Sequence, residues 1–523
     1  MSRPTRNVKY STVAKAFLLA AFLTAVYICH VIVYLHSEMA PLSDFSLKSN
    51  DAMMPPIPRL AHEEEPNNNL DLHQLSQESV NNELNWEPLD RLINDETKPA
   101  SIRILFKILK NHKPLGSFDE EIVDVQAETE RCARYGFKYN SKQTHRRRIF
   151  FGSNIADDSW HMIGNHAAEA YGLYHTAVFV ECNFTQSLFP RRLRFVDGAH
   201  DLDVLQSGIF GPGTDVQVGR YIVDNADEAP QSPLLFENMQ REVILKHWKD
   251  SGMTIDDIGI VGDIDEYFSR DFMLAAQTCD VMKFRRNQNC KGPKIAGYAA
   301  TFESSPNCIY NKTWHNNKPW TRSWTHPDMI IGECVDDIGD AELHSPPAER
   351  DYANGTLGFR LKGKGRRFGD WDKLPKRSKY PLWKPVDFRS ANAGGQTPRK
   401  GKDKDNRHNA FHLHNFFDSL STMRRKYSTY GHRRENVNEL SLSQLQKDVD
   451  IMVTCVMNRE SDAPEDFRYR EGGLDAIIEG GGDAPILFRH PDYVNNLHHE
   501  LKEEIIKDEA KYGNATYFST NKF

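Results

Sequence analysis

Apolar and polar positions along the chain form two kinds of pattern. Short apolar runs at residues 176–180 and 258–261 each end in polar residues, which is typical of buried strands. Around the second run, residues 236–248 and 271–278 carry apolar side chains at helical spacing. Strands that alternate with helices predict an α/β fold. We expect one folded domain over residues 100–523, which is long enough to bury a large core.

The amino-terminal apolar segment has a different character. Residues 16–35 contain no Asp, Glu, Lys or Arg, and about 20 residues form a helix of roughly 30 Å, enough to cross a bilayer. A cleaved signal peptide is the alternative, but the apolar run is longer than the usual ~7–15 residues. Basic residues precede the run, which predicts a cytoplasmic tail over 1–15, a transmembrane signal anchor over 16–36 and a lumenal remainder.

Residues 37–99 have no sustained apolar period and include polar and proline-bearing stretches. Such a composition buries too little apolar surface to offset the entropy of ordering, so we expect a disordered stem. The formal net charge of the chain is −7, which argues against a nucleic-acid partner because that surface would be basic. Basic runs at 360–379 and 399–407 are either solvated loops or a clamp for an anion.

The sequence has eight cysteines, of which Cys29 lies in the predicted membrane span. An odd number therefore remains on the lumenal side, where disulfides form. At least one of these thiols is free or pairs with a second chain, as in a disulfide-linked homodimer. Asn-x-Ser/Thr glycosylation acceptors occur at Asn183, Asn311, Asn354 and Asn514.

Three carboxylates follow the apolar run at 258–261, namely Asp263, Asp265 and Glu266. In extended chain the side chains of Asp263 and Asp265 would point the same way and could hold a divalent cation, which in turn holds a diphosphate. Other Asp-x-Asp pairs, such as Asp201 with Asp203, lack this position between a strand and a helix. A metal and nucleotide site and a surface turn remain the two interpretations.

The other strand, at 176–180, delivers Glu181 and Asn183 at its end. The end of this strand, like the end of the strand at 258–261, would place both side chains at the ligand-binding crevice of an α/β fold. A turn that carries a glycosylation acceptor is the alternative interpretation.

At the ends of these two predicted strands, the sequence resembles glycosyltransferase family 17, the β-1,4-mannosyl-glycoprotein 4-β-N-acetylglucosaminyltransferases. Residues 181–185 read Glu-Cys-Asn-Phe-Thr, and a basic stretch at 190–195 follows. Arg241 precedes the acidic motif at 256–266, and residues 410–414 match a later family motif loosely. The likeness covers roughly 145–290 and 408–460. Residues 291–407 have no match, which puts the acceptor sugar in doubt.

The resemblance implies a GT-A-like nucleotide-sugar-binding domain in the lumen of the Golgi. It implies UDP-GlcNAc as donor, Mn²⁺ as cofactor, and an N-glycan or glycoprotein as acceptor. Metal-assisted inverting transfer would then move GlcNAc to a mannose of the glycan. The expected metal ligands are Asp263, Asp265 and His412, although His412 could equally be a half-buried core residue. The residues expected to contact the nucleotide sugar are Glu181, Asn183, Arg194, Arg241 and Arg285. The alternative for Arg241 and Arg285 is that each is an ordinary salt-bridge partner.

An inverting transfer also needs a general base for the acceptor hydroxyl. The carboxylates that we consider for this role are Glu266, Glu333 and Asp337. Two other functions stay open, because a fold alone does not fix an activity. One is a catalytically silent, membrane-tethered sugar-binding protein, and the other is a transferase with a different sugar donor or acceptor.

Overall fold

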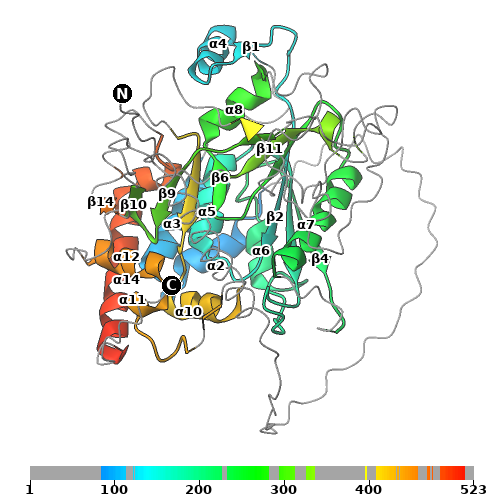
Figure 1. The fold of residues 1–523 in the computed structure, drawn as a ribbon. Coiled ribbons are helices and arrows are strands. Elements are labelled where there is room, and N and C mark those ends of the chain that lie inside the picture. Colours follow the sequence, from blue (N-terminus) through cyan, green and yellow to red (C-terminus); the bar gives the residue numbers. More distant parts are fainter. Residues whose placement is uncertain are drawn as a thin grey trace, which may run out of the picture. The chain divides into compact units, whose positions relative to one another are not determined.

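The structure is a computed structural model. It describes residues 84–112, 124–225, 233–281, 294–311, 326–335, 395–396, 408–430, 433–434, 436–457, 468–470 and 483–512, with the single residues 122, 338 and 474. A sheet forms its centre (Figure 1). This sheet has seven strands in the order β12-β8-β11-β5-β2-β3-β4. Its strands are β2 (Ile149–Ile155), β3 (Tyr174–Cys182), β4 (Asp215–Tyr221), β5 (Ile258–Val261), β8 (Lys294–Ala296), β11 (Asp328–Ile331) and β12 (Gly395–Gln396).

Four adjacent strands of this sheet, β5, β2, β3 and β4, run parallel to one another. Strand β11 pairs with β5 in the antiparallel direction. The predicted strands at 176–180 and 258–261 are therefore both confirmed, as is an α/β fold. A parallel pair needs a crossover, and helices α5 (Trp160–Ala170) and α7 (Pro233–Asp250) precede β3 and β5 respectively.

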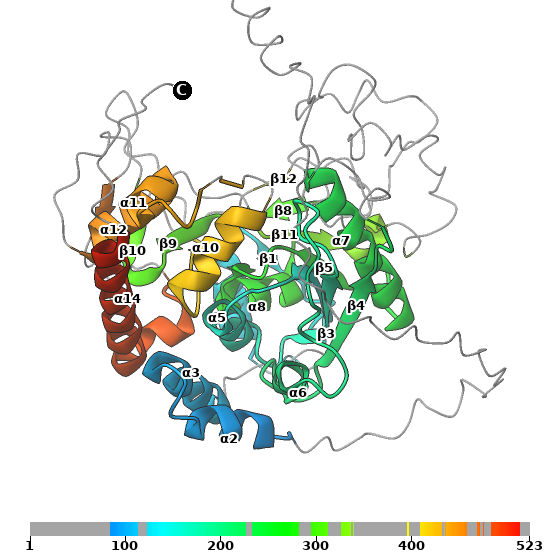
Figure 2. The ribbon, with the colours of Figure 1, turned by 90° about the horizontal axis from the view of Figure 1, so that it is seen from below.

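Consecutive residues of β2 show that the sheet is covered on both faces. The ring of Phe151 lies 4.5 Å from that of His166 on α5. On the other face, a Cβ added at Gly152 would lie 2.3 Å from Ile244 of α7. Neighbouring strand residues point to opposite faces, so α5 and α7 lie on opposite sides of the sheet (Figure 2). The absent side chain at Gly152 lets α7 approach the strand closely.

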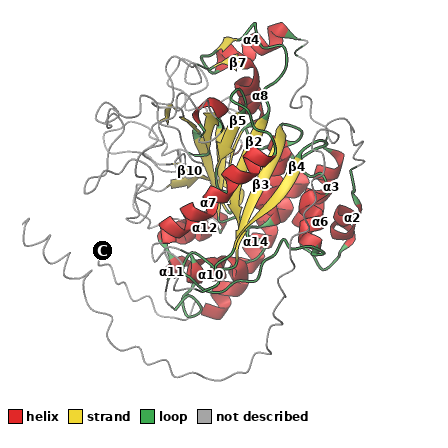
Figure 3. Ribbon diagram, turned by 90° about the vertical axis from the view of Figure 1, so that its right-hand side faces the viewer, coloured by secondary structure: helices red, strands yellow, loops and turns green. Residues whose placement is uncertain are grey.

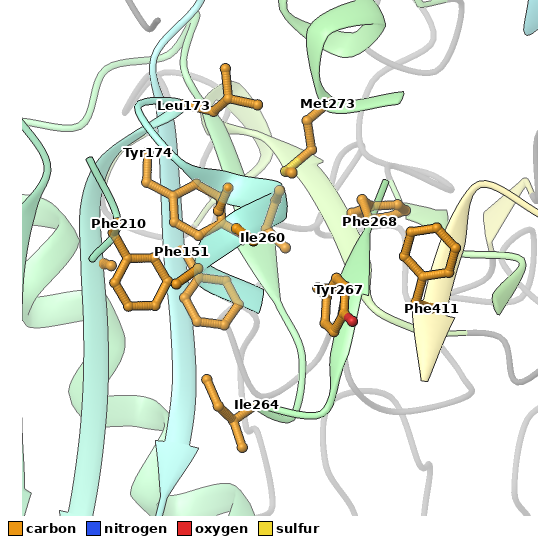
Figure 4. Close-up of a cluster of buried hydrophobic side chains, with 14 of the residues drawn as sticks. Phe151, Leu173, Tyr174, Phe210, Ile260, Ile264, Tyr267, Phe268, Met273 and Phe411 are labelled. Atoms are coloured by element: carbon orange, nitrogen blue, oxygen red, sulfur yellow. The ribbon is translucent and has the colours of Figure 1, made fainter. Parts of the chain in front are cut away.

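A second sheet of five strands has the order β14-β10-β9-β13-β6. Its strands are β6 (Glu266–Phe268), β9 (Ala299–Glu303), β10 (Ser305–Asn311), β13 (Ala410–His414) and β14 (Arg468–Arg470). Strand β6 follows β5 after a turn, so the two sheets are joined at the acidic motif. An apolar cluster with Phe151, Tyr174 and Tyr267 packs beside this junction (Figure 4).

Further helices surround the two sheets (Figure 3). They are α2 (Glu87–Asn94), α3 (Ala100–Asn111), α4 (Val125–Arg134), α6 (His200–Gln206), α8 (Arg270–Thr278), α10 (Leu420–Thr429), α11 (Leu442–Leu445), α12 (Lys447–Val456) and α14 (Pro491–Tyr512), with the 3₁₀ helices η4 (Gly332–Cys334) and η9 (Ile486–Arg489). A small antiparallel pair joins β1 (Lys138–Tyr139) to β7 (Cys279–Asp280). The helices predicted around 236–248 and 271–278 correspond to α7 and α8.

The folded part of the chain begins earlier than the sequence predicts. Helix α2 lies inside the range 37–99, for which we expected a stem, and its Leu89 and Leu92 are buried. Residues 80–523 form one unit by their internal contacts. Within the described residues, no helix is long and apolar enough to cross a membrane. The predicted anchor at 16–36 lies outside the described residues.

Disulfides join elements that are distant in the sequence. Cys132 on α4 bonds to Cys279 on β7, and Cys308 on β10 bonds to Cys455 on α12. Cys182 is a free thiol and is buried at the end of β3. The odd cysteine number had predicted at least one thiol without an intrachain partner, and Cys182 fits that prediction. A disulfide-linked homodimer stays a prediction.

Candidate metal and nucleotide site

The carboxyl ends of β2, β3, β4 and β5 meet at one edge of the central sheet because these strands are parallel. From β2 the chain continues outward to β3 and β4, and then returns to the other side of β2 as β5. The order of strands therefore reverses between β2 and β5. In α/β folds, ligands bind outside the carboxyl ends of the strands at such a switch point. The acidic motif lies here, directly after β5.

The acidic motif forms a tight turn rather than the extended chain that the sequence predicts. The backbone N–H of Glu266 donates to the carbonyl of Asp263 at 2.9 Å. Ile264, between the two aspartates, is buried and points toward the apolar cluster (Figure 4). Because the chain turns, Asp263 and Asp265 do not lie along one face of a strand, and Asp265 comes close to Glu266 instead.

Two contacts from distant elements hold the turn in place. The backbone N–H of Leu413 on β13 donates to the carbonyl of Asp265 at 2.8 Å. The Nδ1 of His166 on α5 lies 3.2 Å from the carbonyl of Ile264, and its Nε2 lies 2.8 Å from the hydroxyl of Tyr174. Burial lowers the pKa of His166 to about 3, so its imidazole is neutral. With Nδ1 protonated, it donates to the turn and accepts from Tyr174.

Strand β13 brings His412 to the turn. His412 pairs with Glu266 across the antiparallel β6–β13 ladder, and directly opposed residues of a ladder share a face. The Nε2 of His412 lies 3.6 Å from Oδ2 of Asp265. One ligand atom from each of Asp265, Glu266 and His412 lies within 4.8 Å of the other two. These three side chains form the candidate metal site, and we call them the metal triad.

The charge of Asp265 is set by competing effects. Burial, the largest effect, raises the pKa of its carboxyl, but His412 and the charge of Lys426 together lower it, and the pKa lies below its usual value. Asp265 is therefore ionised at neutral pH. A separation of 3.6 Å is longer than an ordinary hydrogen bond. Two ligands of one ion, each about 2.1 Å from it, lie about 3–4 Å apart, so the spacing fits a shared ion.

Asp263 makes a different contact from the one the sequence predicts. Its Oδ1 lies 2.6 Å from Nη2 of Arg241 on α7. Arg241 is almost fully buried and also pairs with Glu237 and donates to Asn238. The guanidinium of Arg241 is therefore directed to protein groups in this structure, as in the alternative of a salt-bridge partner, and its role as a phosphate ligand stays a prediction. It positions Asp263 beside the metal triad.

The residues expected after β3 also have structural partners. Glu181 is fully buried, and its two oxygens accept the backbone N–H groups of Arg194 and Phe195. The side chain of Asn183 donates to the carbonyl of Val223 and accepts its N–H. Both side chains therefore fix the loops at the carboxyl edge, and their contact with a nucleotide sugar stays a prediction.

Arg194 is likewise a structural residue. Its Nε donates to Asp201 at 2.6 Å, and its Nη1 donates to the carbonyl of Asp158 at 2.5 Å. The guanidinium stacks over Trp160, with its carbon 4.8 Å from the ring centroid. Nucleotide binding by Arg194 would break these contacts.

Glu333 lies at the wrong end of the sheet to serve as a general base for this site. Strand β11 is antiparallel to β5, and Ile331 pairs with Ile258 at the start of β5. The N–H of Glu333 accordingly donates to the carbonyl of Ile255. Sequence reasoning did not foresee the direction of β11. Asp337 and Arg285 lie outside the described residues.

Sequence reasoning missed two charged residues near the metal triad. Asp158 follows β2, and burial raises the pKa of its carboxyl to about 6, with a further contribution from the charge of Asp265. The positive charge of Lys426 on α10 lowers the pKa of both Asp158 and Asp265. The polar residues after the apolar strand 149–155 were a signal for Asp158, whereas no local pattern pointed to Lys426.

Two carboxylate–histidine pairs also flank the motif. On the second sheet, Oε2 of Glu303 lies 2.7 Å from Nδ1 of His414, and the ring of His414 lies 5.5 Å from that of His412. At the start of β11, Oδ2 of Asp328 lies 2.7 Å from Nδ1 of His326.

In sequence comparisons, no family model and no curated protein matches this chain.

Proposed function

We propose that the protein is a metal-dependent glycosyltransferase that uses a nucleotide-sugar donor. The observation that carries this proposal is the metal triad of Asp265, Glu266 and His412 at the switch point between β2 and β5. A cation at that place would meet the diphosphate of a nucleotide bound at the carboxyl edge of the sheet. The proposed donor is UDP-GlcNAc, in line with the resemblance of the sequence motifs.

The arrangement of strands supports a GT-A-like fold. The order β4-β3-β2-β5 corresponds to the 3-2-1-4 order of doubly wound nucleotide-binding sheets. The second sheet adds His412 to the site from a segment well after the first part of the chain. A nucleotide held by the parallel strands and an acceptor held near the second sheet would then meet at the metal triad.

The chemistry of the metal triad fits Mn²⁺. Two carboxylates and an imidazole are oxygen and nitrogen donors that suit this ion. The carboxylate of Asp265 is ionised, as a ligand must be. When bound, the ion would neutralise charge that develops on the leaving diphosphate. Glu266, which we considered as a general base, is assigned to the metal instead because its carboxylate is grouped with Asp265 and His412.

The residues around the triad keep it in place for this reaction. His166 holds the backbone of the turn from the protein interior, and Leu413 holds the carbonyl of Asp265. Such preorganisation matters because groups already aimed at developing charge need no reorganisation during reaction. In an inverting transfer, the acceptor oxygen forms a bond to the anomeric carbon while the bond from that carbon to the diphosphate breaks, and the acceptor hydroxyl gives its proton to a general base. Asp337, which lies outside the described residues, stays the predicted base.

The proposed setting is the Golgi lumen, with a mannose of an N-glycan as acceptor. The disulfides Cys132–Cys279 and Cys308–Cys455 support an oxidising compartment, where such bonds persist. A type II anchor at residues 16–36 belongs to the same proposal. The acceptor rests on the sequence resemblance.

The test is release of UDP from a panel of UDP-sugars, with Mn²⁺ titrated and an N-glycan acceptor present. The wild-type protein should release UDP from UDP-GlcNAc, and Asp265→Ala should lower the rate by about 10²–10³ because one electrostatic contact to developing charge is lost. Asp203→Ala is the matched control, because Asp203 belongs to another Asp-x-Asp pair and is exposed on α6. Wild-type protein that binds glycan without releasing UDP from any donor would favour a silent sugar-binding protein.

A further inference from the structure

The metal triad with a bound cation would neutralise only part of the negative charge of a diphosphate. A divalent cation is balanced by the carboxylates of Asp265 and Glu266, so the negative charge of a bound diphosphate needs another cation nearby. This inference rests on the proposed function. Most arginines at the carboxyl edge are directed to protein groups, as described for Arg241 and Arg194. Arg191 similarly donates to the carbonyl oxygens of Cys182 and Ile155.

Helix α10 places one lysine at this edge. Arg425 pairs with Asp157, which follows β2. Two residues further on, the hydroxyl of Tyr427 donates to Asn415, which follows β13, at 2.9 Å. The helix therefore spans from the exit of β2 to the exit of β13, and Lys426 lies between these two anchor points. The ammonium of Lys426 lies 5.1 Å from the ring centroid of Phe417.

The contact with Phe417, which follows β13, places the ammonium of Lys426 at the end of the strand that carries His412. Lys426 is half-buried. Burial raises the pKa of Asp158 to about 6, and the charge of Lys426 opposes that rise. Within the part of the chain that the structure describes, Lys426 makes no ion pair at salt-bridge distance.

We propose that Lys426 binds the diphosphate of the donor, on the α10 side of the metal triad. The ammonium is a compact charge with three donors, which suits phosphate oxygens. The contact with Phe417 holds the positive charge at this edge before the ligand binds. Two cationic elements, the metal and Lys426, predict selection of a nucleoside diphosphate over a nucleoside monophosphate.

The experiment measures binding of Mn²⁺ alone, and then of UDP, UMP and uridine at saturating Mn²⁺, to the full-length protein in detergent. Lys426→Met removes the charge but keeps a flexible stem against Phe417. It should weaken UDP binding by about ten- to hundredfold, because a charged hydrogen bond is lost, and UMP binding less. Binding of Mn²⁺ alone and of uridine should stay within about twofold, and Lys426→Arg should retain most of the UDP affinity.

Lys246→Met is the matched control, because Lys246 is an exposed lysine on another helix, α7. It should leave UDP affinity within about threefold. Equal UDP affinity in Lys426→Met and wild type would overturn the inference while leaving the proposed function intact. An equal loss for uridine, or an equal loss in Lys246→Met, would also overturn it, because the effect would then be structural or non-specific. Failure of the wild-type protein to bind UDP with Mn²⁺ would overturn the proposed function itself.

Discussion

His412 lies on β13 and Asp265 lies in the turn before β6, yet Nε2 of His412 is 3.6 Å from Oδ2 of Asp265. The pairing of β13 with β6 produces this proximity, because it sets His412 opposite Glu266. The next residue on β13, Leu413, holds the carbonyl of Asp265 through its backbone N–H. The second sheet therefore both supplies a ligand and fixes the turn that carries the other two.

The contact from His166 to the turn should matter for metal affinity. His166→Phe keeps an aromatic ring against Tyr267, but it removes the donor to the carbonyl of Ile264. We expect Mn²⁺ affinity to fall by about tenfold, the effect of one lost hydrogen bond of roughly 1–1.5 kcal/mol. Calorimetric titration of Mn²⁺ measures the change.

The control for that substitution is His161→Phe. His161 lies on the same helix and is equally buried, but it bonds to the hydroxyl of Tyr493, away from the turn. Its replacement should lower the melting temperature without changing Mn²⁺ affinity. If both variants lost metal affinity to the same extent, His166 would act only through the stability of α5.

A buried carboxyl should make the stability of the protein depend on pH. Burial raises the pKa of Glu169 to about 7, against the opposing effect of the N–H groups of Arg270 and Ile486. Between pH 4.5 and 7 the folded state therefore holds a proton that the unfolded state releases. The free energy of unfolding should fall by about 2–3 kcal/mol as the pH rises through this range.

Urea unfolding at several pH values checks the prediction. Glu169→Gln cannot release this proton, so its stability relative to the wild type should improve as the pH rises. The exposed Glu130 provides the control, since Glu130→Gln should leave the pH dependence unchanged. Parallel pH curves for wild type and Glu169→Gln would refute the assigned protonation of Glu169.

The disulfide between Cys308 and Cys455 should contribute strongly to stability. It closes a loop with a sequence separation of 147 residues and ties β10 to α12. Replacing both cysteines with serine should cost about 2–5 kcal/mol, because the unfolded chain gains conformational freedom. Cys182→Ala, which removes the buried free thiol, should cost about 1–2 kcal/mol. Thermal melts without reductant compare the variants, and equal melting temperatures would contradict this role of the disulfide.

The sequence predicts the part of the site that depends on local pattern. A buried apolar run followed by carboxylates fixes β5 and the position of Asp265 beyond its end. It does not predict the turn at Asp263, because the turn is held by His166 and Leu413 from other parts of the chain. A two-residue spacing predicts a common face only while the chain stays extended.

Long-range pairing decides the remaining roles. Glu333 follows an apolar run much like that of β5, but the antiparallel direction of β11 carries it to the opposite edge of the sheet. Arg241 has the character of a phosphate ligand in sequence, whereas the fold buries it against Asp263 and Glu237. Lys426 has no local motif at all, and only the placement of α10 brings it near Asp265.

Binding of Mn²⁺ to a series of single variants tests the central claim most directly. The variants are Asp263→Asn, Asp265→Asn, Glu266→Gln, His412→Asn and the control Asp203→Asn, each compared with wild type by calorimetric titration and a thermal melt. The metal triad predicts that Asp265→Asn, Glu266→Gln and His412→Asn each lose at least about tenfold in affinity. Asp263→Asn and Asp203→Asn should stay within about threefold, and every variant should still melt cooperatively. Loss of binding in Asp263→Asn with normal binding in Glu266→Gln, or a wild-type protein that binds no Mn²⁺, would contradict the account.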